Sequence, residues 1–148
     1  MWLAKFFLLP ILFLMVFGFD PINKTDQKIQ TFLGNLANKL ATREVENVEG
    51  YFDPKFSFRA CSEMFTLNGL VYRMNKVPKS ESVKLSCDTW RWMDEGVRMT
   101  VHSKGLGQFS EKPMELLLNL DKTIVISGAS MDCERRQRRN VAAASLEQ

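Results

Sequence analysis

His102 is the only histidine in the chain and is therefore the first candidate for acid–base chemistry. A catalytic histidine needs a carboxylate that orients its ring and a nucleophile within hydrogen-bond distance. The residues from Val97 to Val101 alternate between apolar and polar, and this alternation places His102 on the polar face of a strand. No serine stands in a Gly-x-Ser-x-Gly sequence. We expect a surface histidine and assign no catalytic residue.

Cys61, Cys87 and Cys133 are the only cysteines, so the chain can form one disulfide bond and leave one thiol. It contains no Cys-x-x-Cys pair and no paired Cys/His spacing, which argues against a zinc site. The glycine-containing sequence KGLGQ, Lys104 to Gln108, follows a predicted strand and precedes no helix, so it does not fit a dinucleotide-binding turn. We predict a flexible loop there, no bound metal and no cofactor.

The first eighteen residues have the layout of an export signal. Lys5 supplies a positive charge, an apolar run of twelve residues follows from Phe6 to Phe17, and Gly18 is a small residue suited to cleavage. A membrane-spanning helix needs about 20 apolar residues, and no later segment approaches that length. We expect a secreted, extracellular protein without a stable membrane span; the alternative is an uncleaved anchor.

The excess of positive charge lies at the other end of the chain. The formal net charge is +3, but the four arginines of residues 134–148 account for the local excess, and the preceding part of the mature chain is neutral. A neutral domain argues against nucleic-acid binding. Arg136, Arg138 and Arg139 fit a processing-protease site; the alternatives are attraction to anionic glycans or lipid headgroups and a disordered, solvated tail.

The chain divides into a signal peptide (1–18), one domain (19–133) and the basic tail (134–148). One domain of this length can bury a core of its own. Near its start, Asn23 opens the glycosylation sequon Asn23-Lys24-Thr25, so we expect a glycan at that position.

Apolar residues three and four positions apart predict a helix over 25–41 with Thr25 as its N-cap, and shorter patterns predict helices over 42–50 and 66–77. A short strand is predicted over 56–61, after a turn at Asp53-Pro54. From residue 82 onward, alternating residues predict four antiparallel strands in two hairpins, each with one buried face. Helices followed by strands indicate an α+β fold, with N-terminal helices packed on a strongly bent antiparallel sheet.

Two tryptophans interrupt the pattern of the first long strand. Leu85 and Cys87 share one face, but Trp90 and Trp92 fall on the other. A β-bulge near Asp88 would turn both rings to the buried side. Without a bulge they would lie on the outer face, where two tryptophans indicate a binding surface. We favour the bulge, and we keep Trp90 and Trp92 as candidates for a pocket or an interface.

The stretch ATREVENVEGYFDPKFSFRAC, residues 41–61, resembles the second helix, the Phe-Asp-Pro-x-Phe turn and the first strand of nuclear transport factor 2-like domains. The resemblance spans about residues 22–133 and is closest to secreted, cysteine-containing members common in nematodes. It implies a cone, in which the early strand pairs with the sheet of the C-terminal half around a pocket. Cys61 and Cys133 would then end neighbouring strands and form the disulfide bond, and Cys87 would be a buried free thiol; a bridge from Cys87 to either cysteine is the alternative.

The resemblance also implies possible functions. The ketosteroid isomerases of this fold use an Asp base and a Tyr/Asp pair, but neither Tyr51 nor Tyr72 lies in the first predicted helix, so we carry over no catalytic residue. The apolar strand interiors favour a non-catalytic pocket for a small hydrophobic ligand. The alternative is a module that dimerises or binds another protein through the sheet face, with its own side chains filling the pocket. An isomerase or lyase is the least favoured function.

Overall fold

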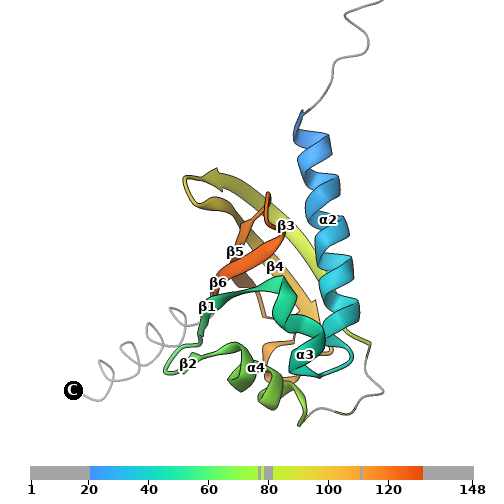
Figure 1. Cartoon of the computed structure of the whole chain (residues 1–148), viewed down its shortest axis with the longest axis vertical. Coiled ribbons are helices and arrows are strands. Elements are labelled where there is room, and N and C mark those ends of the chain that lie inside the picture. Colours follow the sequence, from blue (N-terminus) through green and yellow to red (C-terminus); the bar gives the residue numbers. More distant parts are fainter. Residues whose placement is uncertain (1–20, 77, 79–81, 111, 132–148) are drawn as a thin grey trace, which may run out of the picture.

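The structure is a computed structural model that describes residues 21–76, 78, 82–110 and 112–131, and Figure 1 shows how they are arranged. The predicted signal peptide, Cys133 and the basic tail lie outside these residues. Within the described ranges, no helix has both the length and the apolar character needed to cross a membrane.

In the described chain, six strands form one mixed sheet in the order β2-β1-β6-β5-β4-β3. The strands are β1 (Phe52–Arg59), β2 (Met64–Phe65), β3 (Lys84–Met93), β4 (Gly96–Lys104), β5 (Met114–Asn119) and β6 (Ile124–Ser130). Neighbouring strands are antiparallel except β1 and β6, which run parallel. The α+β fold and the pairing of the early strand with the C-terminal half are confirmed. The prediction that every strand pair is antiparallel is wrong for β1 and β6. The long chain that connects these two strands permits a parallel crossover.

Helix α2 (Pro21–Leu40) packs against β3, and Figure 1 shows it running along one face of the sheet. Its predicted apolar face is confirmed, since the residues at that spacing are buried: Ile29, Phe32, Leu33, Leu36 and Leu40. The predicted N-cap is wrong, because the helix already includes Thr25 in its second turn. The apolar stripe faces the sheet, so burial of this stripe holds the helix in place.

The second predicted helix is much shorter in the structure than expected. The predicted helix over 42–50 is instead α3 (Val45–Val48), a single turn, followed by the 3₁₀ turn η1 (Glu49–Tyr51). Arg43 breaks the helix, because its backbone has a φ of 60°, in the left-handed region. Its buried guanidinium donates hydrogen bonds to the carbonyl oxygens of Met74 (3.1 Å) and Pro78 (2.8 Å). Arg43 thereby joins this turn to the C-terminal end of the next helix.

That next helix, α4 (Leu67–Met74), occupies the predicted 66–77 segment but ends earlier. Thr66 caps it by accepting a hydrogen bond on Oγ1 from the Gly69 backbone N–H (3.4 Å). Figure 1 shows α3 and α4 together at one end of the sheet, below β1 and to the right of β2 in that view. The two short helices therefore close one end of the concave side.

The predicted bulge in β3 is confirmed. Cys87 pairs with Val101 but Thr89 pairs with Thr100, which leaves Asp88 as the extra residue. The bulge turns Trp90 and Trp92 to the face shared with their buried β4 partners. Trp92 is nevertheless 59 % exposed, because it lies beside the β3–β4 turn on the edge strand of the sheet.

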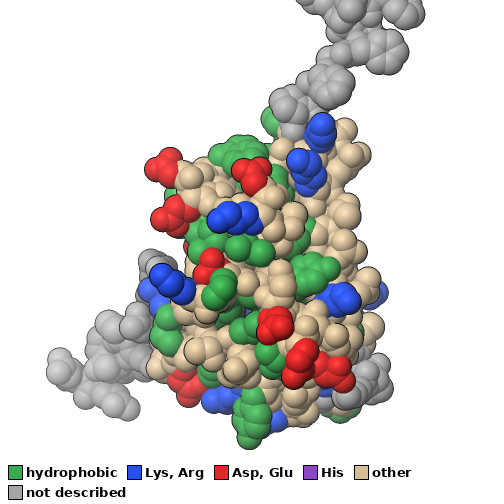
Figure 2. Space-filling model, viewed as in Figure 1, with side chains coloured by type: hydrophobic (Ala, Val, Ile, Leu, Met, Phe, Trp, Pro, Cys, Tyr) green, Lys and Arg blue, Asp and Glu red, His purple; other side chains and the backbone are tan. Residues whose placement is uncertain are grey.

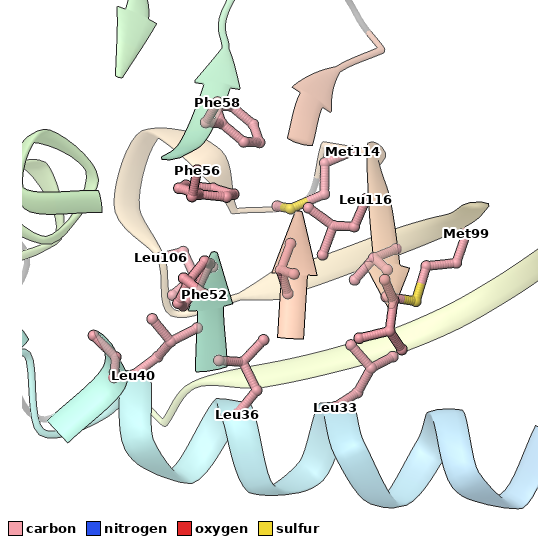
Figure 3. Close-up of a cluster of buried hydrophobic side chains, with 14 of the residues drawn as sticks. Leu33, Leu36, Leu40, Phe52, Phe56, Phe58, Met99, Leu106, Met114 and Leu116 are labelled. Carbon is pink, nitrogen blue, oxygen red and sulfur yellow. The ribbon is translucent and has the colours of Figure 1, made fainter. Parts of the chain in front are cut away.

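The core is built from rows of paired residues on this inner face, some of which Figure 3 shows with the facing leucines of α2. One row crosses the sheet through Met99, Leu116, Gly128 and Phe58, and ends at Phe65 in β2. β1 begins four residues before the predicted strand and contains Asp53 and Pro54, where its pairing with β6 shifts register. The predicted turn is therefore an irregularity inside a strand, which brings Phe52 into the core.

Candidate functional site: an aromatic cleft

The interior of the cone is almost completely filled. A residual cavity of about 30 Å³ remains between the helices and the sheet, and only apolar side chains line it, among them Leu36, Phe56 and Leu116 (Figure 3). Ligand pockets usually measure about 300–1,000 Å³, so this cavity is roughly a tenth of the smallest usual size. The expected interior pocket is thus occupied by the protein's own leucine, methionine and phenylalanine side chains.

A larger, open cleft of about 290 Å³ lies next to this cavity, where the end of β1 meets β2, α4 and the segment before β5. The cleft and the cavity share Phe58, Phe109 and Met114. With Phe65, these residues form an apolar floor, and we call this site the aromatic cleft. The four floor side chains are only 3–9 % exposed, so the cleft opens onto the end of an otherwise filled core.

Phe109 is central to the floor and is held by two serine hydrogen bonds. The buried Ser103 donates its hydroxyl to the Phe109 carbonyl oxygen (2.6 Å), and the Leu106 backbone N–H donates to Ser110 Oγ (2.7 Å). The Phe109 ring packs edge-on against Phe58 at 5.4 Å between ring centroids and against Phe65 at 6.0 Å. These contacts fix the orientation of the floor.

The loop that carries Phe109 differs from the sequence prediction. A flexible loop was predicted over Lys104–Gln108, but the chain forms the 3₁₀ turn η2 (Gly107–Phe109), and Leu106 packs into the core. Gly105 makes this possible, since its φ is +76° and a side chain there would meet the Ser82 carbonyl oxygen at 2.4 Å. Glycine at position 105 therefore allows the chain to pack closely against Ser82, and the loop is part of the packed domain.

Charged side chains stand at the wall of the aromatic cleft. Arg73 of α4 pairs through Nη2 with Glu63 Oε2 at 3.0 Å, and its guanidinium carbon lies 5.3 Å from the centre of the Phe65 ring. Lys112 contributes a second positive charge from the segment before β5. Cys61 also lines the cleft, so one of the cysteines singled out in the sequence reaches this site.

His102 lies on the other face of the sheet. Its Nε2 is 2.7 Å from Asp88 Oδ2, because the bulge turns that carboxylate outward toward the neighbouring strand. Both side chains are exposed, so this is a surface pair, as expected for the histidine. The pair does not contribute to the cleft.

Neither tyrosine joins a carboxylate in the interior. Tyr51 packs against Phe32 at 5.8 Å between ring centroids, and Tyr72 is 64 % exposed on α4. The lining of the interior cavity contains no carboxyl, imidazole or phenol group. The groups that would perform isomerase chemistry are therefore not found at this cavity.

The remaining predicted site residues are dispersed. Trp90 and Trp92 contact each other edge-to-face, with 6.1 Å between ring centroids, on β3 at the sheet edge opposite β2. Asn23 is exposed near the start of α2, where an attached glycan stays a prediction. Cys133 and the tail arginines lie outside the described residues, so the Cys61–Cys133 bond and the processing site also stay predictions.

Cys87 is a free thiol on the inner side of β3, but it is half-buried and not fully buried as predicted. Burial, together with the carboxylates of Asp26 and Asp88, raises the pKa of this thiol to about 11 from an ordinary value of 9.0. Only the thiolate attacks alkylating reagents, so Cys87 is expected to be a poor nucleophile near neutral pH.

We predict that iodoacetamide alkylates Cys87 at least about tenfold more slowly in the folded protein at pH 8 than in the urea-unfolded chain. A pKa two units higher lowers the thiolate fraction about 100-fold, and the greater nucleophilicity of the thiolate offsets only part of this loss. The rate should rise about tenfold per pH unit until the pH approaches the pKa. Quenched time points followed by peptide mass spectrometry measure it. Equal rates in both states would contradict the prediction.

Comparison with protein-family models matches residues 26–135 to the NTF2-like domain. The chain belongs to the NTF2-like domain family. A search of curated protein sequences gives no match. Two solved NTF2-like proteins of Cytophaga hutchinsonii are similar, the first of them of unknown function. The first shares 13 % identity over 67 % of this chain and 84 % of its own, with a TM-score of 0.45. The second shares 14 % over 69 % and 93 %, with a TM-score of 0.46.

Sequence reasoning missed the residues that make the cleft of this NTF2-like domain: Phe65, Arg73, Phe109 and Lys112. A signal was present for Phe109, because it is an aromatic residue two positions after a Gly-x-Gly sequence in an otherwise polar segment. The sequence contains no such signal for Arg73 and Lys112, because a single charged residue on a helix or a loop is usually solvated.

Proposed function

We propose that this NTF2-like domain binds a small hydrophobic ligand without transforming it, and that the ligand occupies the aromatic cleft. The observation that carries the proposal is an open cleft whose floor is formed by the apolar side chains of Phe58, Phe65, Phe109 and Met114. Transfer of a ligand's apolar surface from water onto such a floor is favourable in proportion to the area buried. The volume of about 290 Å³ is just below the usual range for ligand pockets, about 300–1,000 Å³, which favours a small molecule.

The filled interior supports this placement. A ligand inside the cone would have to displace close-packed side chains, and such displacement costs packing energy. At the cleft, a ligand can contact Phe58 and Phe109 without moving the residues behind them. The rigid hydrogen bonds around Phe109 keep the floor preformed, which reduces the entropy lost on binding.

Binding of the neutral dye Nile red, followed by its fluorescence, tests the proposal. We expect saturable binding by the wild-type protein and at least tenfold weaker binding by Ser62→Trp, in which an indole fills the cleft from an exposed position. Ser86→Trp is the matched control, because Ser86 is exposed on the opposite face of the sheet and should leave binding unchanged. Wild-type protein that binds no dye, or equal binding by Ser62→Trp, would refute the site.

Self-association is the second candidate function. Trp92 is 59 % exposed beside Met93 on the edge strand, where a second copy could cover both. The outer sheet face offers less apolar surface, since it carries the Arg98–Glu115 pair (3.4 Å) and the His102–Asp88 pair. Figure 2 shows charges of both signs interspersed with small apolar groups on the face in view. Light scattering that finds a dimer, together with dye that does not bind, would favour this candidate.

We further propose that the chain is secreted after removal of residues 1–18, with a Cys61–Cys133 bond and a glycan on Asn23. The apolar run before Gly18 and the sequon at Asn23 support export through the secretory route. Intact-mass analysis of the secreted chain would report the mature N-terminus, the glycan, and any trimming at Arg139.

A further inference from the structure

We propose that the ligand of the aromatic cleft is amphipathic and carries a carboxylate, whose negative charge pairs with Arg73 and Lys112 while its apolar part lies on the phenylalanine floor. This inference rests on the proposed function, since it specifies the chemical class of the molecule that the cleft binds. Its basis is the position of two positive side chains at the wall of an apolar cleft.

Arg73 is suited to hold a carboxylate. A guanidinium has five N–H donors in a planar fork, and Glu63 Oε2 accepts from Nη2 alone at 3.0 Å. The guanidinium also lies over the Phe65 ring, with its carbon 5.3 Å from the ring centre. This stacking keeps the charged group beside the floor, so one molecule can contact both the ring and the remaining N–H donors.

The balance of charge in the cleft favours an anion. Among the residues that the structure describes, the charged side chains that line it are Arg73, Lys112 and Glu63, which sum to one positive charge. An ammonium group on the ligand would be repelled by both Arg73 and Lys112. A carboxylate would be attracted by these two side chains and would compete only with Glu63. The apolar floor lowers the local dielectric constant, and this strengthens the attraction.

The ion pair with Glu63 does not prevent a ligand carboxylate from reaching Arg73. Its ion pair with Arg73 is exposed, with 53 % of the Glu63 side chain and 35 % of the Arg73 side chain accessible. Exposed pairs of this kind contribute little to stability, so Glu63 can swing away or share the guanidinium when a carboxylate arrives. Removing the Glu63 charge should therefore strengthen binding of an anionic ligand.

Octanoate and octanol, which share a chain and differ in the head group, provide the test by displacement of Nile red at low ionic strength. We expect octanoate to bind about tenfold more tightly than octanol, as for one charge-assisted hydrogen-bonded pair. Arg73→Gln and Lys112→Gln should each remove most of that preference and leave octanol unchanged. Glu63→Gln should increase it. Lys84→Gln, an exposed lysine on β3, is the control and should change neither affinity.

The outcomes separate this inference from the proposed function. Equal affinity for octanoate and octanol, in a protein that binds Nile red, would refute the preference for a carboxylate but not the hydrophobic binding site. Failure of octanoate to displace bound Nile red would also overturn it. A protein that binds no Nile red would refute the proposed function itself. Circular dichroism verifies that each variant is folded, and Lys112→Gln tests the charge independently if Arg73→Gln fails to fold.

Discussion

Phe58→Ala is expected to lower the free energy of unfolding by about 3–5 kcal/mol, the range for removal of a buried phenylalanine ring. Phe58 is 3 % exposed, and its ring separates the interior cavity from the aromatic cleft. Its removal would lose the edge-on contact with Phe109 and merge the two spaces into one larger void. Because small domains are stable by only about 5–15 kcal/mol, a loss of this size leaves the variant marginally folded.

Urea unfolding followed by circular dichroism measures the effect, with the midpoint and slope fitted together. Tyr72→Ala is the matched control, since it deletes an aromatic ring that is 64 % exposed and contacts Lys76 at the surface. Its effect should stay within about 0.5 kcal/mol. Similar losses for the two variants would mean that Phe58 is not packed as described.

Gly128→Val is expected to destabilise the domain by about 3 kcal/mol through overpacking. A Cβ atom at Gly128 would lie 2.6 Å from Phe58 Cδ2 and 2.8 Å from Leu116 Cδ2, closer than carbon atoms can approach. Both neighbours are buried and sit in the same cross-strand row, so neither can move without disturbing β1 or β5. The absence of a side chain at this position is what allows the Phe58 ring to pack closely against β6.

Thermal unfolding by calorimetry would measure this effect in parallel with Gly34→Ala. Gly34 lies inside α2, and a Cβ there meets no atom within 4 Å. The control should therefore stabilise the domain by up to about 1 kcal/mol, from the higher helix propensity of alanine. The prediction for Gly128 is wrong if Gly128→Val unfolds at the temperature of the wild-type protein.

Much of the fold was predictable from the sequence, because periodicity is a local property. The apolar face of α2 follows from residues three and four positions apart, and the alternation in β4 and β5 follows from the two-residue period of a strand. The bulge at Asp88 was predictable for the same reason. One extra residue between Cys87 and Trp90 is needed to place both side chains on the same face of the strand. Helix ends were predicted less well, because the positive φ of Arg43 is stabilised by hydrogen bonds to Met74 and Pro78, which are distant in sequence.

The candidate site depended on tertiary structure. Phe58, Phe65, Arg73 and Phe109 come from separate elements, and no spacing in the chain indicates that they share one cleft. Whether the cone is hollow or filled depends on how side-chain volumes from both layers add up, which residue type alone does not specify. By itself the sequence determined the α+β fold class, the inward faces and the absence of a recognisable catalytic motif, since these depend on neighbours along the chain. The parallel β1–β6 pairing, the filled interior and the charged aromatic cleft depend on contacts between distant residues, and only the tertiary structure decided them.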